Sequence, residues 1–255
     1  MKICNIYNLH GEDLNKSTVF IAGIECEIEG VVGTPQFQHF STTKDGSLRH
    51  EGLEFISHPL PIGTLLEAFT NLHGELELFS VPEGNFSPRT STHVHINCRT
   101  LESEQVKTLL LLYALYEEYF FLLVSPARRG NIHCVPLTET HLPEMYERPI
   151  ECLVDRWHKY TALNLLPLSS LGTVEFRHLQ GTGDPQVLEE WLTCLERLWE
   201  LCQRASITKE SLSSATTLEQ WYAHIFGHSE KMRAMAPTLP SLISNTLIDV
   251  KFALI

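Results

Sequence analysis

Alternating apolar and polar residues mark three strand-length segments that lie far apart in the chain. They run from Thr18 to Gly30, from Thr92 to Cys98 and from Gly172 to His178. Successive side chains of a strand point to opposite faces, so each segment carries apolar residues on one face and charged or imidazole side chains on the other. A further short strand is predicted at Leu53–Ser57, after a Gly/Asp turn near Lys44–Gly46.

Helical spacing follows three of these four predicted strands. It predicts a short helix from Pro61 to Leu72 and a long one across 101–124, where apolar residues recur every three or four positions. Asp184 before Pro185 is a good helix start, and the apolar face that follows continues to about Ala205. Residues 208–255 are expected to be mostly helical. The Pro- and Arg-rich segment 125–149 is longer than the loops that usually just connect two elements, so it is predicted to be a functional loop or a lid.

Composition narrows the class of protein. A chain of 255 residues suits one large domain, or a domain with a helical appendage. Its net charge of −12 argues against tight binding to nucleic acid, which needs a basic surface. The seven cysteines are scattered and never spaced as CxxC, which indicates buried free thiols in a reducing compartment. The start of the chain does not resemble a signal peptide and no segment reads as a membrane span, so we expect a cytoplasmic protein without a membrane partner.

The polar faces of the three segments carry the candidate chemistry. Glu25 and Glu27 share a face of the first segment, and Glu29 continues it but is expected at the surface. In the second segment the shared face carries His93, His95 and Asn97, and in the third it carries Glu175 and Arg177. Each pattern alone also fits an antiparallel strand with one solvated face.

Together the three polar faces predict a site. A sheet that packs helices on its apolar face would gather the carboxylates, imidazoles and guanidinium on the opposite, concave face. Such groups suit Mg²⁺ or a similar hard cation that holds a polyphosphate, with arginine clamping the transferred group. ATP with two or more metal ions fits best. Zinc is less apt, because no cysteine has the spacing of a zinc ligand.

Five short motifs, taken in order, resemble the glutamine synthetase and glutamate–cysteine ligase superfamily, and most closely its amidoligase branch. They are ECE on the early strand, DGS at 45–47, Glu54 in GLEFIS, HVHIN, and EFR at 175–177. The likeness spans about Thr18 to Asp184. It implies an α+β fold with a curved, mainly antiparallel sheet, helices on its convex face and an active-site funnel on its concave face. We therefore expect a catalytic domain over 1–206 and a mostly helical extension, packed on the same domain, over 207–255.

The resemblance also implies a role for individual residues. The implied metal ligands are Glu25, Glu27, His93 and Glu175. Arg177 would steady the transferred phosphoryl group, and Glu54, joined by Asp45, would supply a further catalytic acid. The implied nucleotide-binding residues are His95, Asn97, Arg128, Arg129 and Asn131. The implied substrate-binding residues are Ser47 and Asn164.

The reaction that the resemblance implies is the ligation of a carboxylate to an amine, with ATP and Mg²⁺ or Mn²⁺, through an acyl phosphate. The partners would be small-molecule or peptide acids and amines, and the chain is compatible with an oligomer. Two other functions stay open from the sequence. One is a non-catalytic module that binds a nucleotide or a partner on the same fold. The other is a cupin-like metal enzyme, although Arg99 and Thr100 stand where that family needs a glutamate.

Overall fold

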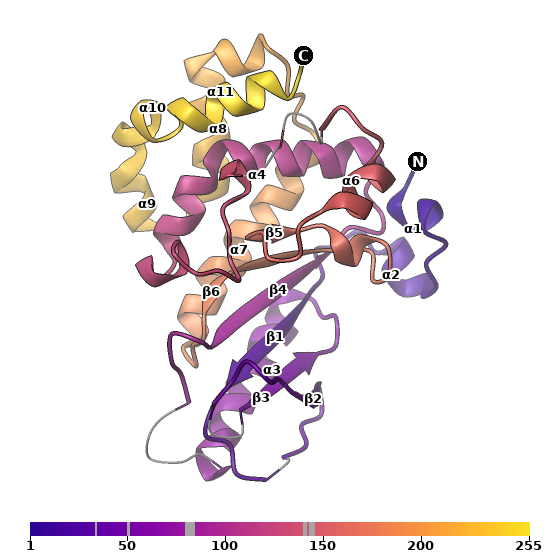
Figure 1. Cartoon of the computed structure of the whole chain (residues 1–255), viewed down its shortest axis with the longest axis vertical. Helices are drawn as coiled ribbons and strands as arrows, with labels where there is room; N and C mark the ends of the chain where they lie inside the picture. Colours follow the sequence, from indigo (N-terminus) through magenta and orange to yellow (C-terminus); the bar gives the residue numbers. More distant parts are fainter. Residues whose placement is uncertain (34, 50–51, 80–84, 140–141, 143–145) are drawn as a thin grey trace.

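The computed structural model describes residues 1–33, 35–49, 52–79, 85–139, 142 and 146–255, and the sheet at its centre is shown in Figure 1. The strands are β1 (Ala22–Ile28), β2 (Phe40–Lys44), β3 (Leu53–Ser57), β4 (Ser91–Asn97), β5 (Leu163–Asn164) and β6 (Thr173–Gln180). They form one antiparallel sheet in the order β2-β3-β1-β4-β6-β5. This single open sheet excludes the cupin alternative, which needs two sheets closed into a barrel.

The four strands predicted from the alternating pattern are confirmed, and they lie side by side in the sheet. β1 is central: it pairs with β3 on one side and with β4 on the other. Two strands were not predicted. β2 has the polar sequence FSTTK and lies at the edge of the sheet, so only one of its sides needs a partner, and β5 is just two residues long.

Helices make up most of the rest of the chain. The α-helices are α1 (Ile3–Ile6), α2 (Glu12–Lys16), α3 (Ile62–Leu76), α4 (Ser103–Leu123), α6 (Ile150–Arg156), α7 (Pro185–Cys202), α8 (Ala215–Phe226), α9 (Glu230–Met235), α10 (Leu239–Leu242) and α11 (Ser244–Phe252). The 3-10 turns are η1 (Glu77–Phe79), η2 (Pro126–Arg128), η3 (Leu137–Glu139), η4 (Leu166–Leu168), η5 (Ser211–Ser213) and η6 (Ala236–Thr238). As expected, α7 follows Asp184, whose carboxylate accepts a hydrogen bond from the Gln186 backbone N–H.

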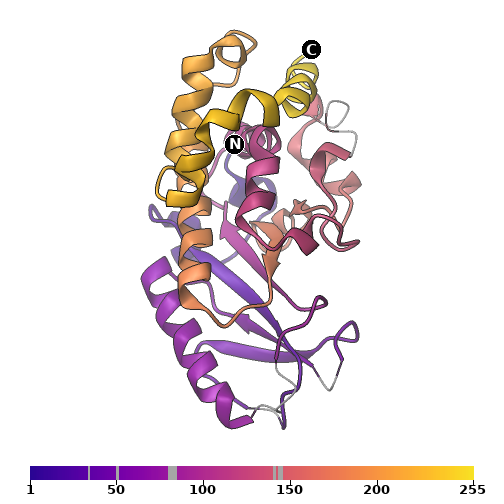
Figure 2. The ribbon, with the colours of Figure 1, turned by 90° about the vertical axis from the view of Figure 1, so that its left-hand side faces the viewer.

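The apolar face of the sheet packs against helices, and Figure 2 shows α3 and α7 along this side. Ile24, Val94 and Phe176 from three adjacent strands are fully or almost fully buried there. Phe176 contacts Phe120 of α4 and Trp191 of α7. The predicted α+β fold, with helices on one face of an antiparallel sheet, is confirmed. The opposite face, which carries the charged side chains, is left free of this helical layer.

Helix α4 is buried on all sides from Leu109 to Glu117, although its sequence pattern predicts a single broad apolar face. It packs against α7 and α11, and Thr246 of α11 donates a hydrogen bond to the Leu115 carbonyl. The Tyr116 hydroxyl donates to the Leu218 carbonyl of α8. The helices after residue 207 therefore cover the side of α4 that faces away from the sheet. In the described part of the chain, no helix is long and apolar enough to cross a membrane.

The segment 125–138 is fastened to the sheet and to α4. The buried Glu117 carboxylate accepts hydrogen bonds from the backbone N–H groups of Leu137 and Thr138, from the Thr138 hydroxyl and from the Tyr113 hydroxyl. At the other end, Arg128 donates to the carbonyls of Arg177 and His178. In this part of the segment predicted to be a functional loop or a lid, a movement of the chain would leave the buried Glu117 carboxylate without its donors, which would be very costly. Residues 140, 141 and 143–145 lie outside the described residues.

Candidate active site

A cavity of about 910 Å³ lies on the polar face of the sheet. Its floor is formed by side chains of β1, β3, β4 and β6, so the alternating pattern of these strands is what places charged groups in it. The predicted residues that line the cavity are Glu25, Glu27, Asp45, Ser47, Glu54, His93, His95, Arg128, Asn131, Asn164, Glu175 and Arg177. Residues from seven segments of the chain therefore meet in one place.

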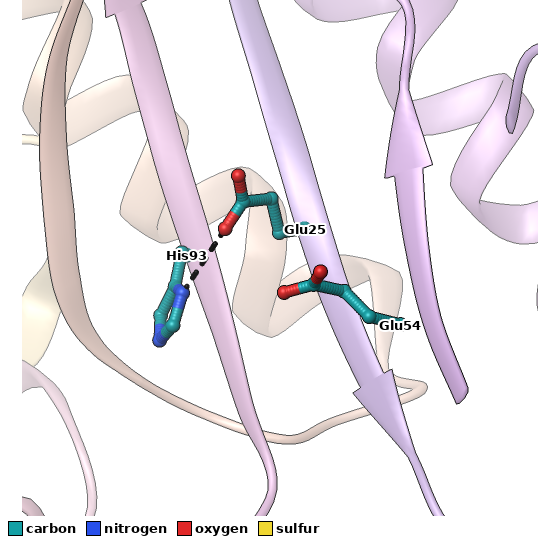
Figure 3. Close-up of side chains that lie close together, drawn as sticks. All are labelled: Glu25, Glu54 and His93. Atoms are coloured by element: carbon teal, nitrogen blue, oxygen red, sulfur yellow. Dashed lines mark hydrogen bonds and ion pairs between the residues drawn. The ribbon is translucent and has the colours of Figure 1, made fainter. Parts of the chain in front are cut away.

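Glu25 is the centre of the cluster. The register of β1 and β4 sets it opposite His93, and its Oε2 lies 3.3 Å from His93 Nδ1 (Figure 3). Its other oxygen lies 3.1 Å from His95 Nε2. His95 is fixed from the opposite side, because its Nδ1 lies 3.0 Å from the Thr173 hydroxyl. One carboxylate thus contacts both imidazoles of the HVHIN motif.

Glu27 lies two residues further along β1, next to the start of β4. Its Oε2 accepts hydrogen bonds from the backbone N–H of Ser91 at 2.7 Å and from the Ser91 hydroxyl at 2.6 Å. The β1–β3 register places Glu54 directly opposite Glu27, and Asp45 follows the end of β2. Glu27, Asp45 and Glu54 each offer a carboxylate oxygen within 4.8 Å of the other two.

Glu175 and Arg177 form the β6 side of the floor. Glu175 accepts a hydrogen bond from Asn164 Nδ2 at 2.6 Å, forms an ion pair with Arg177 and lies 3.3 Å from His93 Nδ1. The Nε of Arg177 donates to the His133 carbonyl at 3.0 Å. The fastened segment 125–138 therefore also holds the guanidinium of Arg177.

Glu25 and Glu54, whose carboxylates lie within 4.8 Å of each other, have opposite pKa shifts. Burial raises the pKa of Glu25, but the hydrogen bonds and charges of His93 and His95 outweigh it and hold this pKa well below its usual range. Burial and, to a smaller extent, the charges of neighbouring acids together raise the pKa of Glu54 to about 7; these acids are Glu25, Glu27, Asp45 and Glu175. Glu54 has no imidazole partner among the described residues, and this explains the difference.

The shift at Glu54 predicts how the metal-free protein responds to pH. A raised pKa in the folded state means that stability is fully present below the unfolded value of about 4.5 and is lost as the pH rises through about 7. Glu54→Gln should therefore stabilise the protein at pH 8, by on the order of 1–2 kcal/mol after discounting for solvent screening, or about 2–6 °C in Tm. Thermal unfolding in a chelator at pH 5 and pH 8 measures this. The exposed Glu189→Gln variant is the control, and a difference that does not grow with pH would contradict the prediction.

The donor set fits a divalent cation. Five carboxylates line the cavity, and three groups of side chains each bring ligand atoms within 4.8 Å of one another. These groups are Glu25–Glu54–His93, Glu25–His95–Glu175 and Glu27–Asp45–Glu54. Mostly oxygen ligands with one imidazole favour Mg²⁺ or Mn²⁺ over zinc.

Two of the residues implied as nucleotide ligands lie elsewhere. Arg129 forms an ion pair with Glu118 of α4 at 2.7 Å and is not among the residues that line the cavity. Asn97 donates to the Leu14 carbonyl and accepts from the Arg99 N–H, which fixes the end of β4. Asn97 lines a smaller neighbouring cavity of about 220 Å³, which shares Glu25, His95 and Leu171 with the main one.

The expectation that Glu29 lies at the surface is wrong. Its side chain is buried, and Oε1 accepts a hydrogen bond from the Arg49 N–H at 2.8 Å. Its backbone carbonyl accepts another from the Asn85 side chain. Glu29 thus holds the loop after β2, which carries Asp45 and Ser47 to the cavity.

Sequence reasoning also missed several residues that line the cavity. Ser91 could have been found, because it lies two positions before His93 and continues the same strand face. Arg89, His133, Lys159 and Tyr160 also line the cavity, but they come from loops, whose side-chain directions follow no period.

A buried cluster of acids, imidazoles and an arginine with shifted pKa values, set in a cavity, is typical of the active site of an enzyme. A family model described as "Putative amidoligase enzyme" matches residues 37–199, more than half of the chain. The chain belongs to this amidoligase family, and the family description places it among the ligases. No curated protein matches the chain.

Proposed function

We propose that the protein is an ATP-dependent carboxylate–amine ligase that works with Mg²⁺ or Mn²⁺ through an acyl phosphate. The observation that carries the proposal is the convergence of Glu25, His93, Glu175 and Arg177 over one cavity, in a member of the amidoligase family. A solvated sheet face does not bury His93 and Glu175 and hold two further charged side chains against them.

The two cavities suggest how the substrates are arranged. The smaller one lies at the end of the sheet where β1 begins and β4 ends, and Ile21, Ile56 and Leu171 give it apolar walls. It suits the flat, apolar faces of a purine base. The phosphates would then extend past His95 towards the carboxylates and Arg177. The acid and the amine would occupy the main cavity beyond them.

The proposed reaction has two steps. A carboxylate oxygen of the acid substrate attacks the γ-phosphorus of ATP, the bond to the β–γ bridging oxygen breaks and ADP leaves. The amine nitrogen then attacks the carbonyl carbon of the acyl phosphate, inorganic phosphate leaves with the bonding electrons, and the amine loses a proton to give the amide. Bound divalent cations would neutralise charge on the phosphoryl oxygens.

Residues of the chain perform the positioning. Glu25, Glu27, Glu54, His93 and Glu175 would hold the cations. Arg177 is fixed by Glu175 and the His133 carbonyl, so part of its planar guanidinium is already oriented before a phosphoryl group arrives. Asn164 donates a hydrogen bond to Glu175, and Ser91 donates one to Glu27. These hydrogen bonds orient the two carboxylates.

We expect ATP with Mg²⁺ or Mn²⁺ to raise the melting temperature. Ligand binding to the native state adds about 2.7 kcal/mol at a ligand concentration 100 times the Kd, which is about 5–10 °C for a protein of this size. Differential scanning fluorimetry measures the shift, with metal alone, ATP with chelator, and AMP with metal as controls. No shift at millimolar nucleotide and metal would contradict the proposal.

A measurement of turnover distinguishes the ligase from the alternative, a non-catalytic module that binds nucleotide. The module predicts the same thermal shift without any release of ADP. Incubation with ATP, Mg²⁺ and pools of acids and amines, followed by mass spectrometry for a condensed product, distinguishes the two. ADP release that depends on an added acid supports the ligase.

A further inference from the structure

The main cavity has two different ends, because the strands of its floor are antiparallel. One end adjoins the smaller apolar cavity at His95. At the opposite end β4 begins with Ser91, which lies next to Glu27 near the end of β1. The residues that line this far end are Glu27, Asp45, Ser47, Glu54, Arg89 and Ser91.

Arg89 differs from the other arginines of the cavity. Arg177 is paired with Glu175 and the His133 carbonyl, and Arg128 is occupied by two β6 carbonyls. The side chain of Arg89 makes one hydrogen bond, from Nη1 to the Ser47 carbonyl at 3.0 Å. Among the described residues no carboxylate forms an ion pair with it.

Arg89 is exposed, so in the absence of substrate water hydrates the N–H groups that make no hydrogen bond within the protein. Three carboxylates line the same end of the cavity, yet among the described residues none of them forms an ion pair with Arg89. Once cations neutralise these acids, Arg89 is left with N–H groups that face the cavity and have no negative partner. A guanidinium binds carboxylate and phosphate groups through two parallel hydrogen bonds, and this geometry is its main advantage over lysine.

We propose that Arg89 is a specificity-determining residue that binds a second anionic group of the acid substrate. The acid would carry a carboxylate or a phosphate a few bonds away from the carboxylate that reacts. The reacting carboxylate lies near the cation ligands at the centre of the floor, and the second anion lies at the far end against Arg89. This inference rests on the proposed ligase function.

Hydroxylamine allows a test without knowledge of the amine, because it converts an acyl phosphate into a hydroxamate that forms a coloured complex with iron(III). The assay contains the full chain, ATP, Mg²⁺, hydroxylamine and acids paired by length. The pairs are succinate and butanoate, glutarate and pentanoate, and adipate and hexanoate. An acid with a phosphonate as its second anion, 3-phosphonopropanoate, separates the two sources of negative charge.

We expect at least one dianionic acid to give a kcat/KM above that of its monoanionic partner by about 10–100-fold, the effect of a charged hydrogen-bonded pair. Arg89→Gln should bring this ratio close to one, and Arg89→Lys should retain part of it. Arg129→Gln, which changes an arginine outside the cavity, is the control and should keep the ratio. If Arg89 only supports the loop through Ser47, its replacement should lower the rates of both acids of a pair equally.

The outcomes separate this inference from the proposed function. Failure of ATP with Mg²⁺ to shift the melting temperature, together with no ADP release, would overturn the ligase itself. If nucleotide binds, the inference is overturned by equal rates for paired acids, by a ratio that survives in Arg89→Gln, or by no reaction with any dianionic acid.

Discussion

Replacing Glu25 by glutamine is expected to remove ligase turnover almost completely. Glu25 belongs to two of the three proposed ligand groups and contacts both His93 and His95. Among the described residues no other carboxylate contacts both imidazoles, so none could replace it. Loss of a residue that only orients a metal ligand costs about 10–100-fold, so loss of this ligand should cost about 10³-fold or more. Acid-dependent release of ADP measures the effect, and isothermal titration with Mn²⁺ should show weakened binding.

The fold of the Glu25→Gln variant should survive with a small loss of stability. The pKa of Glu25 is lowered in the folded state, so its charge contributes stability that is present above the unfolded pKa of about 4.5 and lost as the pH falls through the lower folded value. The variant should therefore melt a few degrees lower at pH 7, opposite in sign to Glu54→Gln. Glu189→Gln on the exposed face of α7 is the matched control. A variant of Glu25 with normal turnover would exclude this residue from the active site.

Arg177→Lys is expected to slow the chemical step much more than it weakens nucleotide binding. The guanidinium contacts Glu175 and the His133 carbonyl at the same time, and the compact ammonium of lysine cannot hold both and still reach a phosphoryl group. We expect kcat to fall by about 10²–10³-fold, as for loss of one oriented donor, while the Kd for ATP changes only a few-fold. Single-turnover kinetics and nucleotide titration give the two quantities.

The chain offers a closely matched control for this variant. Arg129 lies on the segment 125–138, pairs with Glu118 and stacks over Phe121 outside the cavity. Arg129→Lys should leave both kcat and the Kd for ATP close to those of the original protein. Equal losses of rate and nucleotide affinity in Arg177→Lys would instead assign Arg177 to binding alone.

Much of the sheet and its floor could be predicted because strand alternation is a local property. The pattern fixed which side chains of β1, β4 and β6 share a face, and the cavity indeed contains Glu25, Glu27, His93, His95, Glu175 and Arg177. A strand face is only a direction, however, and does not say where a cavity ends. Asn97 shares the face of His95 but lies beyond the main cavity, and Glu29 shares the face of Glu27 but is covered by the loop after β2.

Loops set the limit of prediction from this sequence. Arg128 and Arg129 are adjacent and chemically the same, yet the first points to the β6 carbonyls and the cavity and the second points to Glu118. The choice depends on the turn η2 and on hydrogen bonds to a strand about 50 residues away in the chain. Likewise, a single hydrophobic pattern could not show that α4 is buried on all sides, because that depends on α8 and α11 much later in the chain.

The fastening of residues 125–138 by Glu117 and Arg128 has a consequence for the timing of each catalytic cycle. A wall anchored by buried hydrogen bonds at both ends would have to break them to move, so we do not expect this part of the chain to act as a gate in the proposed reaction. On that side we expect substrates to exchange by diffusion past a fixed wall. Solvent viscosity should affect this exchange only as it affects the diffusing molecules themselves.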